Sequence, residues 1–174
     1  MNYDDYIDKI PNFPKEGILF YDIAPLLYNQ LAFKSIIEEI AKNIEACKPD
    51  LIVAIESRGF LVASALSIIM DKGFLMVRKK GKTPGKTISY EYQLEYGTDL
   101  LEIRENINIK DKKIVIVDDL LATGGTVQAA INLIHKTGAS VCCLAFLIEL
   151  AELGGRKKIE DKVKDFNIFS VLKY

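Results

Sequence analysis

The chain has 174 residues, of which 49% are hydrophobic and 27% charged, a balance typical of one compact domain that buries a full core. Its formal net charge of −1 excludes a general attraction to nucleic acid or to an anionic membrane, so any cationic function must be local. Two of the cysteines are adjacent in an apolar run, which does not suit a disulfide framework, so we expect reduced thiols. We see neither a signal peptide nor an apolar run of ~20 residues that could span a membrane, so we expect a cytoplasmic protein.

The N-terminal segment of about residues 1–28 is polar at first and then apolar. Residues 1–12 predict a short polar helix that ends before Pro11. Residues 12–27 are rich in apolar and aromatic side chains, but their prolines and glycine exclude one continuous helix through the segment. Such a segment is ordered only if it packs on another part of the chain. It therefore covers an edge of the core or forms an aromatic wall for a planar ligand.

Predicted strands and helices alternate through the rest of the chain. Helices are indicated by apolar residues at three- and four-residue steps, and buried strands by short continuous apolar runs. Helices are predicted at 30–48, 60–70 and 126–136, and strands at 51–55, 74–77, 87–92, 99–103, 114–117, 140–148 and 166–172. Right-handed crossovers between such strands predict a single α/β domain, with a mostly parallel twisted sheet, helices on both faces and an antiparallel flap.

Three loops with unusual chemistry leave the carboxyl ends of the predicted parallel strands. They cover residues 56–59, 78–86 and 118–126. Ligands of open α/β sheets bind beyond the carboxyl ends of the strands. We therefore expect the three loops to converge on one functional site.

Two adjacent carboxylates, Asp118 and Asp119, follow the predicted strand at 114–117. They could simply be solvated, but clustering like charges without a partner is costly. As hydrogen-bond acceptors they suit the two vicinal hydroxyls of a ribose. They also suit a divalent cation, bound directly or through water.

The turn after the acid pair leads into the predicted helix at 126–136. Backbone N–H groups at a helix start, together with threonine hydroxyls, suit a single terminal phosphate. The turn has no lysine and lacks the spacing of both the P-loop and the dinucleotide fingerprint. Glycine turns before helices are common, so the prediction depends on the strand and acids that precede it. The phosphate-binding candidates are Ala122, Thr123, Gly124, Gly125 and Thr126.

The loop at 78–86 is strongly basic. It could be a solvated turn, a nucleic-acid patch or a mobile flap that closes over a polyanion such as diphosphate. The nucleic-acid interpretation lacks interleaved aromatic residues and a basic chain. A closing flap would exclude water from a reactive intermediate. The cations of the loop are Arg78, Lys79, Lys80, Lys82 and Lys86.

Arg58 and Glu95 are the remaining charged candidates. Arg58 lies between a buried strand and a buried helix, where it either caps strand carbonyls or, with the Gly59 N–H, binds a second anion. Glu95 lies in the antiparallel excursion near the basic loop, and its context leaves both an inert surface residue and a catalytic acid open. His135 is the one histidine, which argues against a zinc site and against a serine–histidine–acid triad.

The stretch Val117–Thr126 resembles the phosphoribosyl pyrophosphate motif of the type I phosphoribosyltransferases. Other segments resemble, in the same order, those of the family members that use adenine. They are residues 13–20, 56–60, 78–85, 94–98 and 154–156. The resemblance covers essentially the whole chain. It implies the fold of that family, with a base-binding hood at about 1–28, a flexible loop at about 78–97, and a homodimer.

The resemblance also implies a reaction, in which adenine and phosphoribosyl pyrophosphate give AMP and pyrophosphate with Mg²⁺ in purine salvage. By position, Asp118 and Asp119 hold the ribose hydroxyls and residues 122–126 cradle the 5′-phosphate. Mg²⁺ has no dedicated protein ligands and is held mainly through the substrate, with water-mediated contact near the acid pair as an option.

The leaving pyrophosphate and the base have their own implied residues. Arg58 contacts the pyrophosphate, in a loop whose Ser57–Arg58 peptide is often cis in the family. Arg78, Lys79 and Lys82 belong to the flexible loop, and some of these reach a neighbour's site in the family's homodimers. Adenine stacks on Phe20, its edge is read by the backbone of Leu19 and Tyr21, and Glu95 matches the general acid/base at the purine N7. Tyr21 departs from the family, because many members carry a basic residue there.

Two rival functions share the phosphate turn. A sibling enzyme for hypoxanthine, xanthine or orotate is one, but Ala122 stands where oxopurine enzymes commonly carry an acid. A non-catalytic regulator that senses phosphoribosyl pyrophosphate is the other. Such regulators typically carry nucleic-acid-binding parts and a degraded flap, whereas this chain keeps the flap and Glu95 and shows no appended domain.

Overall fold

The computed structural model describes residues 1–93, 97–162 and 167–174. The strands are β1 (Asp8–Pro11), β2 (Leu19–Asp22), β3 (Leu51–Ile55), β4 (Phe74–Lys79), β5 (Thr87–Gln93), β6 (Thr98–Arg104), β7 (Lys113–Leu121), β8 (Ser140–Glu149) and β9 (Asn167–Lys173). The α-helices are α1 (Ala24–Tyr28), α2 (Gln30–Glu45), α3 (Gly59–Met70), α4 (Gly125–Lys136) and α5 (Gly155–Glu160). Within these described ranges, no helix is long and apolar enough to cross a membrane.

The main sheet has the strand order β5-β6-β4-β3-β7-β8-β9. The neighbours from β4 to β9 are parallel, whereas β6 pairs antiparallel with both β4 and β5. β1 and β2 form a separate antiparallel pair. The expected α/β fold, with a mostly parallel sheet and an antiparallel flap, is therefore confirmed.

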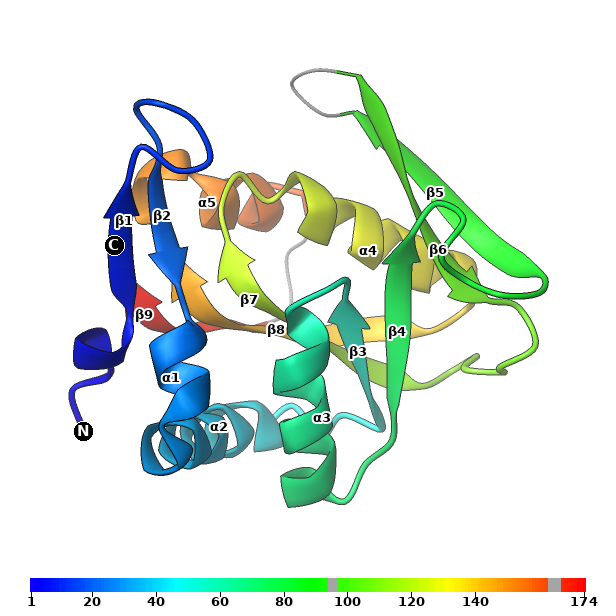
Figure 1. Ribbon diagram of the computed structural model, residues 1–174. Coiled ribbons are helices and arrows are strands. Elements are labelled where there is room, and N and C mark those ends of the chain that lie inside the picture. Colours follow the sequence, from blue (N-terminus) through cyan, green and yellow to red (C-terminus); the bar gives the residue numbers. More distant parts are fainter. Residues whose placement is uncertain (94–96, 163–166) are drawn as a thin grey trace.

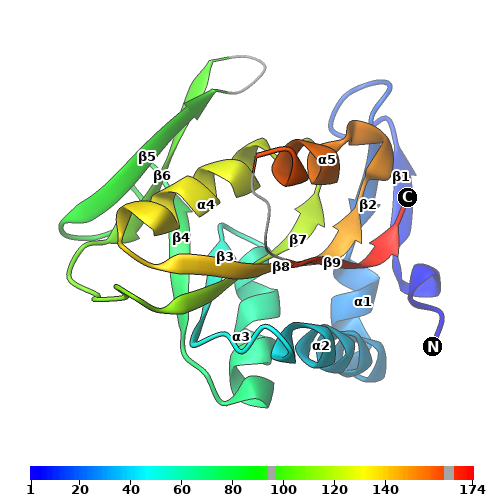
Figure 2. The same ribbon diagram turned by 180° about the vertical axis from the view of Figure 1, so that it is seen from behind.

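Helices cover both faces of the sheet. Figures 1 and 2 show α1, α2 and α3 on one side and α4 and α5 on the other. The central strands alternate between these two layers: Ile52 and Ala54 of β3 belong to the cluster under α2 and α3, and Val53 and Ile55 to the cluster under α4. Both faces are thus dry, which explains the continuous apolar runs of β3, β7 and β8.

The structure differs from the sequence prediction at the N-terminus. In place of a helix over residues 1–12 there is one 3-10 turn, Tyr3–Tyr6, followed by β1. Asp8–Pro11 instead bonds to β2, with Asp8 opposite Asp22 and Pro11 opposite Leu19. Pairing with β2 satisfies the backbone N–H and C=O groups of this segment, whereas a helix ending before Pro11 would leave the carbonyls of its last turn without partners.

Two strands also extend into the loops that carry candidate site residues. β7 continues through Asp118 and Asp119 to Leu121, because β8 pairs with it as far as Glu149. β4 continues to Lys79, because Arg78 and Lys79 pair with β6. Part of the segment at 78–97 is therefore strand rather than loop, and the acid pair lies within a strand rather than beyond one.

An internal ion pair fixes the edge formed by β8 and β9. Arg156 donates from Nε and Nη2 to the two carboxylate oxygens of Glu149, at 2.8 and 2.5 Å, and from Nη1 to the carbonyl of Ile168 at 2.8 Å. Glu149 is only 3% exposed. The guanidinium holds the pKa of the Glu149 carboxyl below its usual value, so this buried acid remains charged and paired.

Candidate active site

A cavity of about 200 Å³ lies at the carboxyl ends of the central strands. Its walls include Glu56 after β3, Lys79 at the end of β4, and Asp118 with residues 122–127 along and after β7. Each of the three loops singled out in the sequence therefore contributes to one cavity. The expected convergence at the carboxyl edge of the sheet is present in the structure.

The two carboxylates occupy different environments. Asp119 is 7% exposed, and its Oδ2 forms an ion pair with Nε of Arg58 at 2.8 Å. Asp118 accepts a 2.9 Å hydrogen bond from the Asp119 N–H. Burial first, and then the neighbouring Asp119 carboxylate, raise the pKa of Asp118 well above its usual range. The pair is thus an electrostatically costly arrangement that Arg58 partly offsets.

Gly59 explains how α3 approaches the acid pair. A Cβ at Gly59 would lie 2.9 Å from Oδ1 of Asp118 and 3.0 Å from the carbonyl oxygen of Val117. Only a glycine lets the first turn of α3 pack this closely on β7. The N-terminal end of α3, with its partial positive charge, consequently faces the buried carboxylate.

The glycine turn is held by a second glycine pair from a distant part of the chain. Gly124 has a φ of +76° and precedes α4 as its cap. A Cβ on Gly155 would lie 2.1 Å from the carbonyl oxygen of Ala122, and one on Gly124 would lie 2.9 Å from the carbonyl oxygen of Gly155. The backbone of α5 therefore packs directly on the turn that leads into α4. The N–H groups of the first turn of α4 are available to an anion in the cavity.

Two basic residues in the segment 78–82 already bind other groups of the protein, which the sequence does not indicate. Arg78 donates from Nη2 to Glu56 at 3.2 Å and from Nη1 to the carbonyl of Lys82 at 2.6 Å. The Lys79 N–H donates to Glu56 at 2.8 Å, and its ammonium lies 3.7 Å from a carboxylate oxygen of Asp99. Arg78 is thus a structural anchor of this loop, and the Lys79 ammonium is the more exposed cation beside the cavity.

Three residues at the site had no assigned role in the sequence analysis. Glu56 joins the end of β3 to Arg78 and Lys79. Burial raises the pKa of Glu56, but the Lys79 N–H and the Arg78 guanidinium outweigh it and lower the pKa overall. Asp99 binds Lys79 and accepts from the Tyr92 hydroxyl, and Gly155 supports the turn. An acid directly after a buried strand, as at Glu56, is a usable sequence signal, whereas the role of Gly155 depends on tertiary packing.

The residues expected to bind the base lie on β2. Phe20 meets Phe13 edge to face at 5.1 Å, and the Arg58 guanidinium lies 5.4 Å from the centroid of the Phe20 ring. The Tyr21 ring stacks on Tyr174 at 4.4 Å. Arg58 therefore connects β2 to the acid pair. Tyr21, which stands where many family members carry a basic residue, therefore packs in an aromatic stack.

Two expectations from the resemblance meet different outcomes. Glu95, the expected acid/base, lies outside the described residues; the strands on either side pair up to Gln93 opposite Thr98. The cis peptide joins Glu56 to Ser57, one bond earlier than the Ser57–Arg58 peptide that the resemblance implied.

The donors present suit a magnesium ion held chiefly by a substrate. Among the described residues, no cluster of three or more histidine, cysteine or acidic side chains could cage a metal. Asp118 and Asp119 offer hard carboxylate oxygens, which Mg²⁺ prefers, but Arg58 already occupies one of them. Two acids beside a phosphate turn fit a partly hydrated ion that takes its other ligands from phosphate oxygens.

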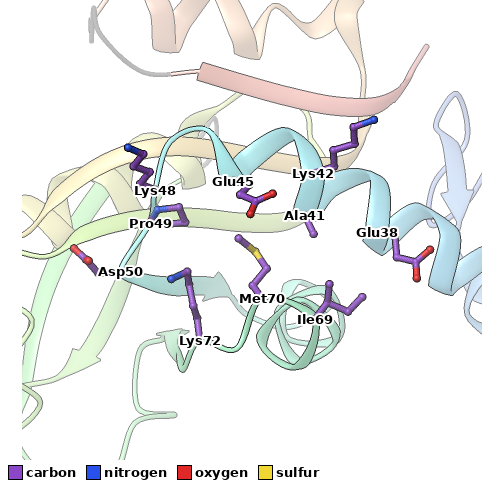
Figure 3. A pocket seen from close by; sticks show the side chains of 10 residues that line it. All are labelled: Glu38, Ala41, Lys42, Glu45, Lys48, Pro49, Asp50, Ile69, Met70 and Lys72. Atoms are coloured by element: carbon purple, nitrogen blue, oxygen red, sulfur yellow. The ribbon is translucent and has the colours of Figure 1, made fainter.

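A larger groove of about 640 Å³ lies at the other end of the sheet (Figure 3). Its walls come from the C-terminal parts of α2 and α3 and from Lys48–Asp50, just before β3. This is the amino end of the parallel strands, where ligands of such folds do not usually bind. Lysines and acids alternate around it, so no single charge dominates. Size alone therefore does not locate the site.

A family model described as "Phosphoribosyl transferase domain" matches residues 26–173. This match covers most of the chain and includes every element that lines the cavity. The chain belongs to the phosphoribosyltransferase family.

Individual relatives narrow this class further. An adenine phosphoribosyltransferase of Rhodospirillum centenum is 52% identical over 160 residues, covering 92% of this chain and 94% of its own. The crystal structure of the enzyme from Thermoanaerobacter pseudethanolicus is 47% identical with a TM-score of 0.92, covering 99% of this chain and 98% of its own. The structure from Saccharomyces cerevisiae, complexed with an imino-altritol bisphosphate and adenine, is 37% identical with a TM-score of 0.87, covering 95% and 94%. Within the family, the chain groups with the adenine phosphoribosyltransferases.

The close packing at Gly155 gives a direct test of the phosphate turn. Gly155→Ala places a methyl group against the Ala122 carbonyl, so the turn or α5 must move. We expect a loss of about 1–3 kcal/mol of stability from overpacking, together with weaker binding of phosphoribosyl pyrophosphate. Thermal unfolding and calorimetric titration measure the two effects.

Gly73→Ala is the matched control, because its Cβ would make an ordinary 3.5 Å contact with Leu51. Equal stability and equal ligand affinity of the two variants would contradict the proposed support of the turn by Gly155.

Proposed function

We propose that this chain transfers the phosphoribosyl group of phosphoribosyl pyrophosphate to adenine, giving AMP and pyrophosphate in purine salvage. The observation that carries the proposal is the cavity in which Asp118, one of the two adjacent acids, and the glycine turn meet at the carboxyl ends of the central strands. The family of the chain and the names of its relatives support the same reaction. Adenine was bound in the yeast relative's structure.

In this proposal the ribose 5-phosphate lies along β7 and the start of α4. Asp118 and Asp119 accept hydrogen bonds from the ribose hydroxyls. Residues 122–126 bind the 5′-phosphate through backbone N–H groups and the hydroxyls of Thr123 and Thr126. This division matches charge to charge, because the carboxylates would repel a phosphate whereas the helix start attracts it.

The pyrophosphate is assigned to the cations around the mouth of the cavity. Arg58 and the Lys79 ammonium bind its oxygens, with Arg78 and Lys82 shaping the loop through their mutual hydrogen bond. A bound Mg²⁺ neutralises part of the negative charge that grows on the leaving group. Arg58 exchanges Asp119 for the pyrophosphate when the substrate binds, since both anions compete for the same guanidinium.

The base is assigned to a hood formed by about residues 1–28. Phe20 supplies an aromatic face, and the backbone groups of Leu19 and Tyr21 read the edge of adenine. Phe13 packs against the ring of Phe20 and limits its rotation. The backbone edge of a strand offers donors and acceptors at fixed spacing, which suits recognition of a planar base.

The chemistry follows from charge development at the ribose. As the bond to pyrophosphate breaks, positive charge grows on the sugar and negative charge on the leaving group. Asp118 and Asp119 lie on the sugar side and the cations on the leaving-group side, so both charges are stabilised in place. Glu95 exchanges a proton with the purine N7, and closure of the segment at 78–97 excludes water.

We further propose a single domain over 1–174, a cytoplasmic location and a homodimer. The described cysteines are free, as suits a reducing compartment. α3 exposes Leu61 and Ile68, seven residues apart on one helix face, at 43% and 84% of their surfaces. Such an apolar helix face suits burial against a second copy, which would bring loop cations near a neighbouring site.

Substrate selection tests the function itself. With phosphoribosyl pyrophosphate and Mg²⁺, we expect adenine to be converted to AMP, and hypoxanthine, xanthine, guanine and orotate to react much more slowly. Chelation of Mg²⁺ should abolish turnover and its return should restore it. A spectrophotometric assay measures each reaction. Preference for an oxopurine would favour the sibling enzyme, and binding of phosphoribosyl pyrophosphate without any turnover would favour a regulator.

The assignment of Glu95 predicts a separation of binding from catalysis. Glu95→Gln keeps the size and polarity of the side chain but cannot exchange the proton, so we expect kcat to fall by about 100-fold or more. The dissociation constant of phosphoribosyl pyrophosphate should stay within twofold of the parent value. Glu91→Gln, on the same hairpin, is the control. Equal loss of binding and turnover would make Glu95 a structural residue.

The dimer proposal is tested at Ile68, the most exposed apolar side chain of the α3 face. Ile68→Glu places a charge on a surface that a second copy would bury, and we expect it to convert a dimer into a monomer in sedimentation experiments. Lys34→Glu, on the exposed face of α2, is a charge-changing control. A parent chain that sediments as a monomer at micromolar concentration would rule out this interface.

A further inference from the structure

The ring of Tyr174 makes three contacts with the hood. It stacks on Tyr21 at 4.4 Å with an interplanar angle of 24°. Its hydroxyl donates to a carboxylate oxygen of Asp4. The Lys9 ammonium lies 4.7 Å from the ring centroid and pairs with Asp4 at 2.8 Å. One side chain from the end of β9 thus meets β1, β2 and the turn before them.

The backbone of Tyr174 is fixed on the other side. Its N–H donates to the carbonyl of Glu149 at 2.9 Å, and its carbonyl accepts from the Ala151 N–H at 2.7 Å. The side chain of Glu149 is held by Arg156, and the preceding Gly155 packs on the phosphate turn. Tyr174 therefore connects the hood to the same rigid group that supports the phosphate turn.

The hood requires such a connection. β1 and β2 form a sheet of their own, and an isolated pair of strands is at best marginally stable in water. The core holds the hood from below, through Tyr3, Ile7 and Ile23. Those contacts keep the segment folded onto α2, and β2 itself reaches the same cluster through the partly buried ring of Tyr21. The Tyr21–Tyr174 stack acts on the base-reading strand itself.

We propose that Tyr174 is a positioning residue for the base: through its stack on Tyr21, it sets the distance between the base-reading strand and the phosphate turn. The inference rests on the proposed binding of adenine at Leu19–Tyr21. AMP is a molecule of fixed length, so the base site and the phosphate site must be held in register for both ends to bind at once. The stack also gives Tyr21, which replaces a basic residue common in the family, a defined function.

Replacing the ring tests the proposal. Tyr174→Leu keeps an apolar side chain but removes the stack, so we expect the KM for adenine to rise about two- to twelvefold, the range that an aromatic pair contributes. kcat and the KM for phosphoribosyl pyrophosphate should stay within twofold. Tyr174→Phe keeps the ring and loses only the hydrogen bond to exposed Asp4, so it should behave as the parent does. Tyr28→Leu, on a side chain 94% exposed, is the control.

A second variant keeps the proposal testable if Tyr174→Leu fails to fold. Tyr21→Leu removes the same stack from the other ring, so it should raise the KM for adenine to the same extent. The double variant should be no worse than either single one, because both delete one interaction. Equal increases in both KM values, or a Tyr174→Phe variant as impaired as Tyr174→Leu, would overturn the proposal.

A parallel Phe20→Leu variant separates the two hypotheses. If it raises the KM for adenine while Tyr174→Leu and Tyr21→Leu do not, the base site is correct and the positioning role is wrong. If none of the three variants changes the KM for adenine, the base does not bind at β2, and both proposals fail.

Discussion

Two adjacent carboxylates near the carboxyl end of the interior strand β7 are the constraint on which the site depends. Asp118 and Asp119 repel each other in a poorly hydrated place, and the raised pKa of Asp118 expresses that cost. The surrounding chain compensates locally. Arg58 pairs with Asp119, and the absence of a side chain at Gly59 lets the positive end of α3 reach Asp118. A protein accepts such a cost where the charges serve a ligand.

The same region shows why the phosphate turn is rigid while the mouth of the cavity is adaptable. Gly124 and Gly155 approach so closely that neither tolerates a Cβ. Arg156, the residue after Gly155, is held in place by its hydrogen bonds to the buried acid Glu149. On the opposite side of the cavity, the Lys79 side chain is 59% exposed, and its ammonium lies 3.7 Å from a carboxylate oxygen of Asp99. Buried, fully bonded groups resist movement, whereas exposed ion pairs contribute little and exchange partners easily. Rigid binding of the phosphate and adjustable binding of the leaving group are consistent with this difference.

Much of the fold could be predicted from residue patterns, for identifiable reasons. The runs 51–55 and 114–117 are apolar throughout because both of their faces are covered, and this made their parallel pairing predictable. The helix predicted at 126–136 was offset by one residue, since Gly125 already has helical geometry. The helix prediction for residues 1–12 is wrong because β1 exists only through pairing with a separate segment, which begins eight residues after β1 ends, and no local pattern encodes that partner. The acid pair and the turn were found for the opposite reason: their chemistry is contiguous in sequence. Gly155 and Tyr174 act across long sequence separations, so their roles appeared only with the tertiary packing.

Arg58 connects these observations, because it serves several sites at once. Its guanidinium bonds Asp119, which we assign to the ribose, and lies over the ring of Phe20, which we assign to the base. Its proposed partner in the reaction is a third group, the pyrophosphate. In the proposed reaction a diphosphate, which carries more negative charge than one carboxylate, draws the guanidinium away from Asp119. Asp119 then exchanges a cation for the ribose hydroxyls, and the face of Phe20 becomes free for adenine. The ion pair between Arg58 and Asp119 thus offsets the repulsion within the acid pair, and under the proposed function its replacement would couple binding of the sugar phosphate to access of the base.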